Sequence, residues 1–550
     1  MSKKDNTLVK NASFLMVAAL ISKIIGMIYK SPLSAMLGNE SFGCFQFAQN
    51  AYFILLMIAS FSIPQAVSKI MAERIAFKRY RDAQRVFKGA LLYAALAGGA
   101  VALFCVFGAS IMVPDNMSNA RLALQMLAPT IFISGLLGVF RGYFQAYRNM
   151  MPTSLSQIIE QIANACVALA MAGYMMRLFS NQGEDAAIRW GAAGATMGTG
   201  AGVSAAFLFM LFVYAVNRKT IRRKIERDRV SQNESYGRVM KIIVMIVMPI
   251  IFSAFIYNVN GYINSYMYSE FMGMKGLEKN TIQALYAEYG YYMTLINIPL
   301  TLASTAPTSM IPEVSAHYAR NDIKEATEKT NKAAWISMLI SIPAAVGLGV
   351  LAKPITALLF PATSGVAAHL MILGVVTIVL NGMSNISNGV LQGIGKPNIP
   401  MVNAAVSLAV DVVLLGVLLA FTDLGIYCVV IAMIAYAIVM CVLNDRAMKK
   451  YMDYKNPWKE AYLPPFLASI PMGIVAWLLY FGLDKVMPEK VLGSISVSIG
   501  ICLVITIAIA AAVYFIVYLF VAKPSRESLM GFPGSGIIIR LASRFHLLRD

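Results

Sequence analysis

The chain has 550 residues, of which 58% are hydrophobic and only 13% are charged. Its length suits three or four soluble domains, but such domains carry roughly a quarter charged residues, so this composition excludes them. The net charge of +19 would suggest nucleic acid on a soluble chain. Here, apolar runs of about 20 residues recur, the length that crosses about 30 Å of hydrocarbon as a helix, and they indicate an integral membrane protein.

Fourteen apolar segments predict an all-α polytopic membrane protein. In chain order they are 8–30, 42–66, 86–113, 121–147, 153–176, 187–216, 238–268, 283–312, 331–352, 366–392, 399–421, 424–445, 461–482 and 491–522. An even number of spans places both termini on one side, and Lys and Arg favour that side by roughly four to one. Because basic residues follow the cytoplasmic face, we expect both termini to be cytoplasmic. The positive charge then faces anionic inner-leaflet lipids, and nucleic acid is not implied.

The chain also contains signs of an internal duplication. When Pro64 is placed on Pro307, the charged segments that follow them align, and the stretches after Arg141 and Asn388 match at nearly the same offset. Two such matches predict parallel six-helix repeats, an arrangement typical of transporters that enclose a central site. We expect an N-terminal lobe at 1–216, a basic cytoplasmic linker at 217–237, a C-terminal lobe at 238–445, two extra transmembrane helices at 446–522 and a cytoplasmic tail at 523–550.

The first span contains two cationic residues, Lys23 and Lys30. Seven residues make almost two helical turns, so both lie on one face, with Gly26 between them. A charge within a span is costly and is by default a functional hypothesis. Two interpretations stay open for Lys23. It pairs with an acid such as Glu160 to hold helices together, or it lies in an aqueous cavity as part of a cationic site.

Polar residues recur at helical spacing in four spans, two in each predicted lobe. They are Gln46, Gln49 and Asn50; Gln157, Glu160, Gln161 and Asn164; Tyr257, Asn260, Gly261 and Asn264; and Asn381, Ser384, Asn385, Asn388 and Gln392. Any one stripe is explained by interhelical hydrogen bonds, but four together favour a shared hydrophilic cavity. Asp411 stands alone in its span, where a structural hydrogen bond and proton binding are both open. Gly194, Gly198 and Gly202 predict close helix packing.

Several of these motifs together resemble the oligosaccharide flippases of the multidrug/oligosaccharidyl-lipid/polysaccharide export superfamily. The resemblance rests on residues 22–33 (SKIIGMIYKSPL) with Leu37-Gly38, and on 141–145 (RGYFQ), 157–161 (QIIEQ) and 311–315 (IPEVS). Within that superfamily the chain is most similar to the stage V sporulation protein B-like branch, which is related to MurJ-type lipid II flippases. The resemblance extends over the whole chain, including the two extra spans.

This resemblance implies two six-helix lobes in a bacterial cytoplasmic membrane, with no cofactor and no metal site. The implied cargo is a polyprenyl-diphosphate-linked saccharide that moves from the inner to the outer leaflet by alternating access. From the charges and polar stripes together with the Arg141 motif, we expect the headgroup cavity to be lined by Lys23, Lys30, Gln46, Asn50, Arg141, Gln157, Glu160, Asn164, Asn260, Asn264, Asn385 and Asn388, with Glu160 and Asp411 as candidates for ion or proton coupling. Where MurJ-type proteins have an Arg-Asp pair this chain has Tyr29-Lys30, which leaves the glycan open.

Other functions remain alternatives. A cation-coupled multidrug exporter of the same superfamily requires an acid within the spans, and Glu160 or Asp411 would serve. A scaffold that binds other envelope-synthesis proteins is also open. A membrane enzyme of polysaccharide synthesis requires a carboxylate or histidine cluster, whereas His317, His369 and His546 are widely separated, so we expect no enzyme activity.

Overall fold

A computed structural model describes residues 18, 20–232, 234–486, 491–492 and 495–523. The predicted tail after residue 523 and the first half of the first predicted span lie outside these residues. The described chain divides into two units. One contains the residues as far as Gly290 together with Gly416–Ile426, and the other contains Tyr291–Leu415 and the described residues from Tyr427 onward.

The first unit begins with helical residues 20–28 and is built almost entirely of helices. Its elements are α2 (Lys30–Leu56), η1 (Met57–Phe61), α3 (Ile63–Ala76), α4 (Tyr80–Phe107), α5 (Ala109–Met112), η2 (Asp115–Met117), α6 (Ala120–Met126), α7 (Ala128–Ala146), α8 (Met151–Phe179), η3 (Ser180–Gln182), α9 (Glu184–Glu226), α10 (Tyr236–Met274) and the first turns of α11 (Lys279–Ala319).

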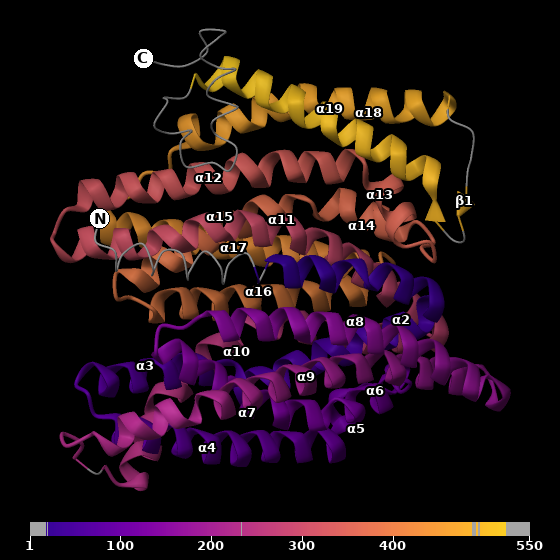
Figure 1. Cartoon of the computed structure of the whole chain (residues 1–550). Helices are drawn as coiled ribbons and strands as arrows, with labels where there is room; N and C mark the ends of the chain where they lie inside the picture. The colour runs from indigo at the N-terminus through magenta and orange to yellow at the C-terminus, as the bar shows by residue number, and fades with distance from the viewer. Residues whose placement is uncertain (1–17, 19, 233, 487–490, 493–494, 524–550) are drawn as a thin grey trace. The chain divides into compact units, whose positions relative to one another are not determined.

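The second unit contains the rest of α11 and the helices that follow it. These elements are α12 (Ile323–Val350), α13 (Ala352–Leu359), α14 (Val366–Gly374), α15 (Val376–Gly393), α16 (Asn398–Phe421), α17 (Tyr427–Met452), η4 (Trp458–Tyr462), α18 (Leu463–Val486), β1 (Val491–Leu492), β2 (Ile495–Ser496) and α19 (Val497–Ala522). Within this unit, α18 and α19 run side by side (Figure 1).

The all-helical membrane fold is confirmed. In the part of the chain that the structure describes, eleven helices are long and apolar enough to cross a membrane, and α14 with α15, bent by 46°, makes a twelfth. Each of the fourteen predicted spans overlaps a helix, because α11 covers the eighth and residues 20–28 cover part of the first. Between the two-residue strands β1 and β2 the pairing is antiparallel, so α19 begins six residues later than predicted.

The boundary between the two units does not coincide with the predicted linker. Because α10 and the start of α11 pack with the first unit, that unit extends to Gly290. The linker itself begins in a helix, since α9 continues through Glu226 rather than ending at residue 216. Its Lys, Arg and Glu residues are good helix formers, and Arg222 pairs with Glu226 at 2.7 Å one turn later. The pseudo-symmetry of two six-helix lobes stays a prediction.

Close helix packing explains the glycine repeat on α9. A Cβ atom at Gly198 would lie 2.5 Å from Ala168 Cβ and 2.6 Å from the Asn164 carbonyl oxygen of α8. Such short distances mean that α8 and α9 are in backbone contact, as the spacing predicts. A second cluster, around Phe87, Phe140 and Tyr143, packs α4 against α7 with ring centroids 4.8–5.3 Å apart. These contacts hold the polar faces of the first unit in fixed positions.

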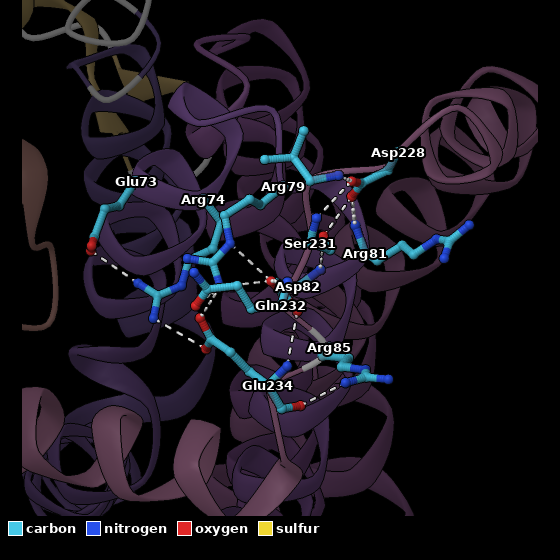
Figure 2. Close-up of polar contacts among 11 residues, drawn as sticks. Glu73, Arg74, Arg79, Arg81, Asp82, Arg85, Asp228, Ser231, Gln232 and Glu234 are labelled. Carbon is cyan, nitrogen blue, oxygen red and sulfur yellow. Dashed lines mark hydrogen bonds and ion pairs between the residues drawn. The ribbon is translucent and has the colours of Figure 1, made fainter.

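A network of buried charges holds the linker against the turn before α4 (Figure 2). Asp82 is fully buried and accepts hydrogen bonds from Arg79 Nε and Nη2 at 2.9 and 2.7 Å. The same carboxylate accepts the backbone N–H groups of Gln232 at 2.9 Å and Glu234 at 3.1 Å. The Glu234 carboxylate in turn binds Arg79 at 2.8 Å and Arg74 at 3.2 Å. The linker is therefore fastened by at least four charge-assisted bonds.

A second carboxylate, Asp228, shapes the linker just before this network. Burial by itself raises the pKa of Asp228, but hydrogen bonds from the Ser231 hydroxyl and from the backbone N–H groups of Arg81, Val230 and Ser231 outweigh it and lower the pKa to about 2. The folded-state pKa is therefore below the ordinary value. The stabilisation is fully present above about pH 4 and is lost as the pH falls through about 2.

We expect Asp82→Ala to release the linker. The substitution leaves the backbone N–H groups of Gln232 and Glu234 without their acceptor and removes one of the two carboxylates that bind Arg79, at a cost of about 3–5 kcal/mol. Limited trypsin digestion of the purified protein then cleaves at Arg227 and Arg229 much faster than in the wild type. Asp115→Ala is the matched control, because its carboxylate is exposed and pairs only at the surface. Equal cleavage rates in the two variants would contradict the role of Asp82.

Candidate functional site

The kink in α2 brings the second predicted lysine next to a predicted polar residue. Lys30 Nζ donates to Gln46 Oε1 at 3.3 Å, although the two residues are 16 positions apart. In a straight helix they would be about 24 Å apart. Gly38, with φ +72°, breaks the helix between them and turns the chain back on itself. A side chain at this backbone conformation is strained, so the position favours glycine.

The first helical segment also faces the polar side of α8. A Cβ atom at Gly26 would lie 3.0 Å from Gln161 Oε1, so the two helices approach closely at this point. Lys23 is three residues before Gly26, on the same helical face, and its side chain is largely exposed. The structure therefore places the first segment beside the predicted polar stripe of α8 at Gly26 and Gln161, while Lys23 stays exposed.

Asn50 joins three helices of the first unit. Its Nδ2 donates to the Ser265 hydroxyl at 3.1 Å, the Tyr286 hydroxyl at 3.2 Å and the Gly261 carbonyl at 3.3 Å. Ser265 and Tyr286 are themselves hydrogen-bonded at 2.7 Å. Gln49, one residue earlier, donates to the Thr199 hydroxyl of α9 at 2.8 Å. The polar stripe of α2 is thus in contact with α9, α10 and α11.

Glu160 has a cationic partner on the neighbouring helix. Arg141 Nη2 of α7 lies 2.7 Å from Glu160 Oε2 of α8, and both side chains are about one-fifth exposed. Arg141 Nε also donates to the Ser156 hydroxyl at 3.0 Å. The sequence singled out both residues but did not pair them, and it suggested Lys23 as the counter-ion. In a membrane the pair avoids two isolated charges in hydrocarbon.

The other predicted site residues of the first unit differ in how deeply their side chains are buried. Gln157 is half-buried, Asn164 and Asn260 are buried at 8% exposure, and Asn264 is fully buried. The Asn164 carbonyl contacts the Gly198 backbone, so its helix is in tight contact with α9. That these four residues line one shared cavity stays a prediction.

In the second unit the predicted amides take different roles. Asn388 Oδ1 accepts from Asn444 Nδ2 at 2.8 Å, and Asn444 Oδ1 accepts from Asn403 Nδ2 at 2.8 Å. This chain of amides links α15, α17 and α16, which supports the alternative of interhelical hydrogen bonding for Asn388. Asn385, three residues earlier, is exposed, and Asp411 of α16 is fully buried.

An apolar groove of about 710 Å³ lies between α12, α15 and the start of α18 in the second unit. Val346 and Val350 of α12, Val379 of α15, and Trp458 and Phe466 form much of its wall. Trp458 and Phe466 are more than half exposed. In a membrane-spanning unit, such a surface accepts hydrocarbon chains rather than water.

Some residues of this region were not singled out from the sequence. Ser265 and Tyr286 bind Asn50, yet hydroxyl residues are common in membrane helices and give no specific signal. Glu288 is 1% exposed and belongs to the predicted span 283–312. An acidic residue within an apolar segment marks a candidate functional residue, so the sequence could have identified Glu288. Within the described ranges, no cluster of three His, Cys, Asp or Glu side chains is arranged to hold a metal ion.

Comparison with known proteins places these features in a family. The family model of polysaccharide biosynthesis proteins matches residues 8–317, and the MatE model matches residues 249–418. Lipid II flippase MurJ of Bacillus subtilis (strain 168) is 24% identical over 425 residues, which cover 74% of this chain and 77% of that protein. Stage V sporulation protein B of the same organism is 22% identical over 536 residues, covering 97% and 99%.

Solved structures show the same fold at low sequence identity. Lipid II flippase MurJ in an inward closed conformation matches with a TM-score of 0.62 and 15% identity, covering 92% of this chain and 97% of that one. An inward-facing multidrug resistance MATE family transporter also has a TM-score of 0.62, with 16% identity, covering 81% and 99%. Both likenesses concern the arrangement of helices.

We expect the Arg141–Glu160 pair to show strong energetic coupling. Each single substitution, Arg141→Gln or Glu160→Gln, leaves one partly buried charge unpaired, whereas the double substitution removes both. A double-mutant cycle on unfolding in detergent should give a coupling free energy of about 1–3 kcal/mol. Glu184→Gln is the control, since Glu184 lies in the exposed first turn of α9. A coupling near zero would show that the contact does not stabilise the fold.

Proposed function

The chain belongs to the polysaccharide biosynthesis protein family, within the multidrug/oligosaccharidyl-lipid/polysaccharide export superfamily, and from this we propose that it is a flippase. Its cargo is a polyprenyl-diphosphate-linked saccharide, lipid II or a related cell-envelope precursor. The cargo moves from the inner to the outer leaflet of the bacterial cytoplasmic membrane by alternating access. The names of the two Bacillus relatives and the cationic first segment support this proposal.

The observation that carries the proposal is the position of Lys30. Its ammonium group is held at Gln46 by the turn at Gly38, beside a helix whose other polar residues are satisfied by α9, α10 and α11. A diphosphate headgroup cannot cross hydrocarbon unaided, and Lys30 together with Lys23 would screen its charge. Lysine binds phosphate as a point charge without the bidentate fork of arginine, which suits a site that must also release.

The membrane potential supplies a direction for this movement. A potential that is negative inside favours outward movement of negative charge by about 2.3 kcal/mol per charge per 100 mV. In the proposed orientation both termini and the basic linker are cytoplasmic, where they face anionic lipids. The potential therefore assists export of an anionic headgroup. Export that is driven in this way requires no chemical reaction within the protein.

The apolar groove of the second unit provides a place for the lipid tail. A cargo with a long polyprenyl chain keeps that chain in the bilayer while the headgroup passes through protein. The groove between α12, α15 and α18 has the volume of a small-molecule site and almost only apolar walls. The extra helices after residue 445 contribute Trp458 and Phe466, which gives them a role in tail binding.

A cation-coupled multidrug exporter is the second candidate function. The MatE match over residues 249–418 and the likeness to a MATE transporter favour it. Such an exporter requires an acid that is free to bind a cation, whereas Glu160 is paired with Arg141 at 2.7 Å. Asp411, which is fully buried on α16, is the other acidic residue that the sequence analysis names for ion or proton coupling. A scaffold for envelope-synthesis proteins would need neither residue.

We expect the double variant Lys23→Ala/Lys30→Ala to fold and to lose transport. Removal of both ammonium groups leaves the diphosphate without its counter-charges, so translocation of a fluorescent polyprenyl-diphosphate saccharide in proteoliposomes falls at least tenfold. Lys219→Ala/Lys241→Ala is the matched control, because it removes two exposed lysines, one from the end of α9 and one from the start of α10. Normal translocation by the Lys23/Lys30 variant would refute the headgroup site.

We expect lipid that copurifies with the protein to identify the cargo and its tail site. Mass spectrometry of the purified wild type should detect a polyprenyl-diphosphate species. Val346→Asp places a charge in the apolar groove and should reduce the bound species several-fold, while Val413→Asp, at an exposed position on α16, serves as the control. Recovery of organic cations instead of the diphosphate lipid would favour the exporter.

A further inference from the structure

A polar cavity of about 730 Å³ lies in the first unit, at the opposite end of α9 from the linker network. It is enclosed by the start of α6, the η3 turn, the first two turns of α9 and the first residue of α11. In Figure 1, α6 lies toward the right-hand end of this unit, and the linker lies toward the left. In the proposed orientation the cavity opens on the outer face of the membrane. None of the proposed headgroup residues lines it.

Lys279, Asn119 and Asp185 form a hydrogen-bonded triad in one wall of this cavity. The charges of Lys279 and Asp185 offset each other. Lys279 Nζ donates to Asn119 Oδ1 at 3.1 Å and lies 3.3 Å from Asp185 Oδ1. Asn119 Nδ2 also donates to Asp185 Oδ1, at 2.9 Å. The triad joins the start of α9 to the start of α11. Since Lys279 neutralises Asp185, this wall contributes hydrogen-bonding groups but little net charge.

A positive charge remains on the neighbouring turn of α9. Arg189 follows Asp185 by four residues, so both lie on the face of α9 that lines the cavity. Arg189 is exposed, and its charge acts on Asp185 together with that of Lys279. Only Lys279 comes within salt-bridge distance of Asp185 in the described part of the chain, so the wall with Arg189 included keeps a net positive charge. Arg121, on another wall, already binds Asp115 at 2.5 Å and the Val113 carbonyl. The guanidinium of Arg189 is therefore available to bind an anion in a bidentate manner, through two N–H groups.

An aromatic ring lies directly beside this arginine. Trp190 lines the cavity and stacks on Phe179 of α8, with ring centroids 4.3 Å apart and planes within 8° of parallel. The stacking holds the indole in one orientation. Flat aromatic faces bind the C–H face of a sugar ring, while amide and guanidinium groups bind its hydroxyls. Gln182 and the Oε1 atom of Gln125, whose Nε2 donates to the Val106 carbonyl, supply amide groups around the cavity.

We propose that this cavity binds an anionic saccharide on the outer face, with the sugar ring on Trp190 and its acidic group on Arg189. The volume lies within the range of small-molecule sites and admits a disaccharide rather than a whole lipid-linked cargo. The inference rests on the proposed function, because the saccharide is the headgroup after export or the cell-wall glycan made from it. The site captures the headgroup as it leaves the transport pathway and so disfavours its return.

The test is direct binding of soluble sugars to the purified full-length protein by calorimetry. The probes are N-acetylglucosaminyl-N-acetylmuramic acid, which has one carboxylate, the neutral di-N-acetylchitobiose, and inorganic phosphate alone. We expect the acidic disaccharide to bind at least tenfold more tightly than the neutral one. Arg189→Gln should abolish that preference, and Trp190→Leu should weaken both sugars about equally. Arg177→Gln, an exposed arginine outside the cavity, should leave binding unchanged.

The outcomes separate this site from the flippase itself. Lys23→Ala/Lys30→Ala should lose transport and retain the preference for the acidic disaccharide, whereas Arg189→Gln should lose that preference and slow net export only when saccharide accumulates outside. If the wild type binds the acidic disaccharide but translocates no lipid, the proposed function fails and this site stands. Equal affinity for both disaccharides, unchanged binding by Arg189→Gln, or displacement of the sugar by phosphate at equal concentration would overturn the proposal.

Discussion

The reversal of the chain at Gly38 is the constraint on which the candidate site depends. A lysine within hydrocarbon is unfavourable unless a polar partner is near, and the amide that Lys30 binds, Gln46, would be too far away along a straight helix. One positive φ value resolves this by folding the first segment back beside the second. The remaining polar groups of α2 then contact α9, α10 and α11, so the local turn determines how the helices of the first unit share their hydrogen bonds.

The two units handle buried polar groups differently. In the first, amides and hydroxyls join helices around a cationic residue, and one carboxylate is balanced by Arg141. In the second, three asparagines form a chain between α15, α16 and α17, and the main accessible hollow is apolar. A carrier of amphiphilic molecules needs both environments, since headgroup and tail impose opposite solvation requirements. The division of polar and apolar surfaces between the units agrees with that requirement.

Much of the architecture followed from composition, because lipid imposes a fixed helix length and excludes charge. The fourteen spans and the close helix packing at Gly198 were predicted from composition and from the glycine spacing. The contacts between particular helices were not predicted, because spacing reveals which residues share a helix face but not which helix lies opposite that face. Glu160 was therefore matched to Lys23 before Arg141 was known to lie beside it. Asn388 was assigned to a cavity because its stripe is indistinguishable from one that hydrogen-bonds to Asn444.

The length of α9 has a mechanical consequence. At 1.5 Å per residue its 43 residues extend over about 64 Å, roughly twice the thickness of the hydrocarbon layer. One uninterrupted helix thus joins the polar cavity near Asp185 to the ionic network that holds the linker after Glu226. Pivoting such a helix by about 5° about one end displaces the other by about 5 Å, a full helical turn. A rigid α9 would carry a displacement at one end across the bilayer to the other, because no flexible joint interrupts the helix.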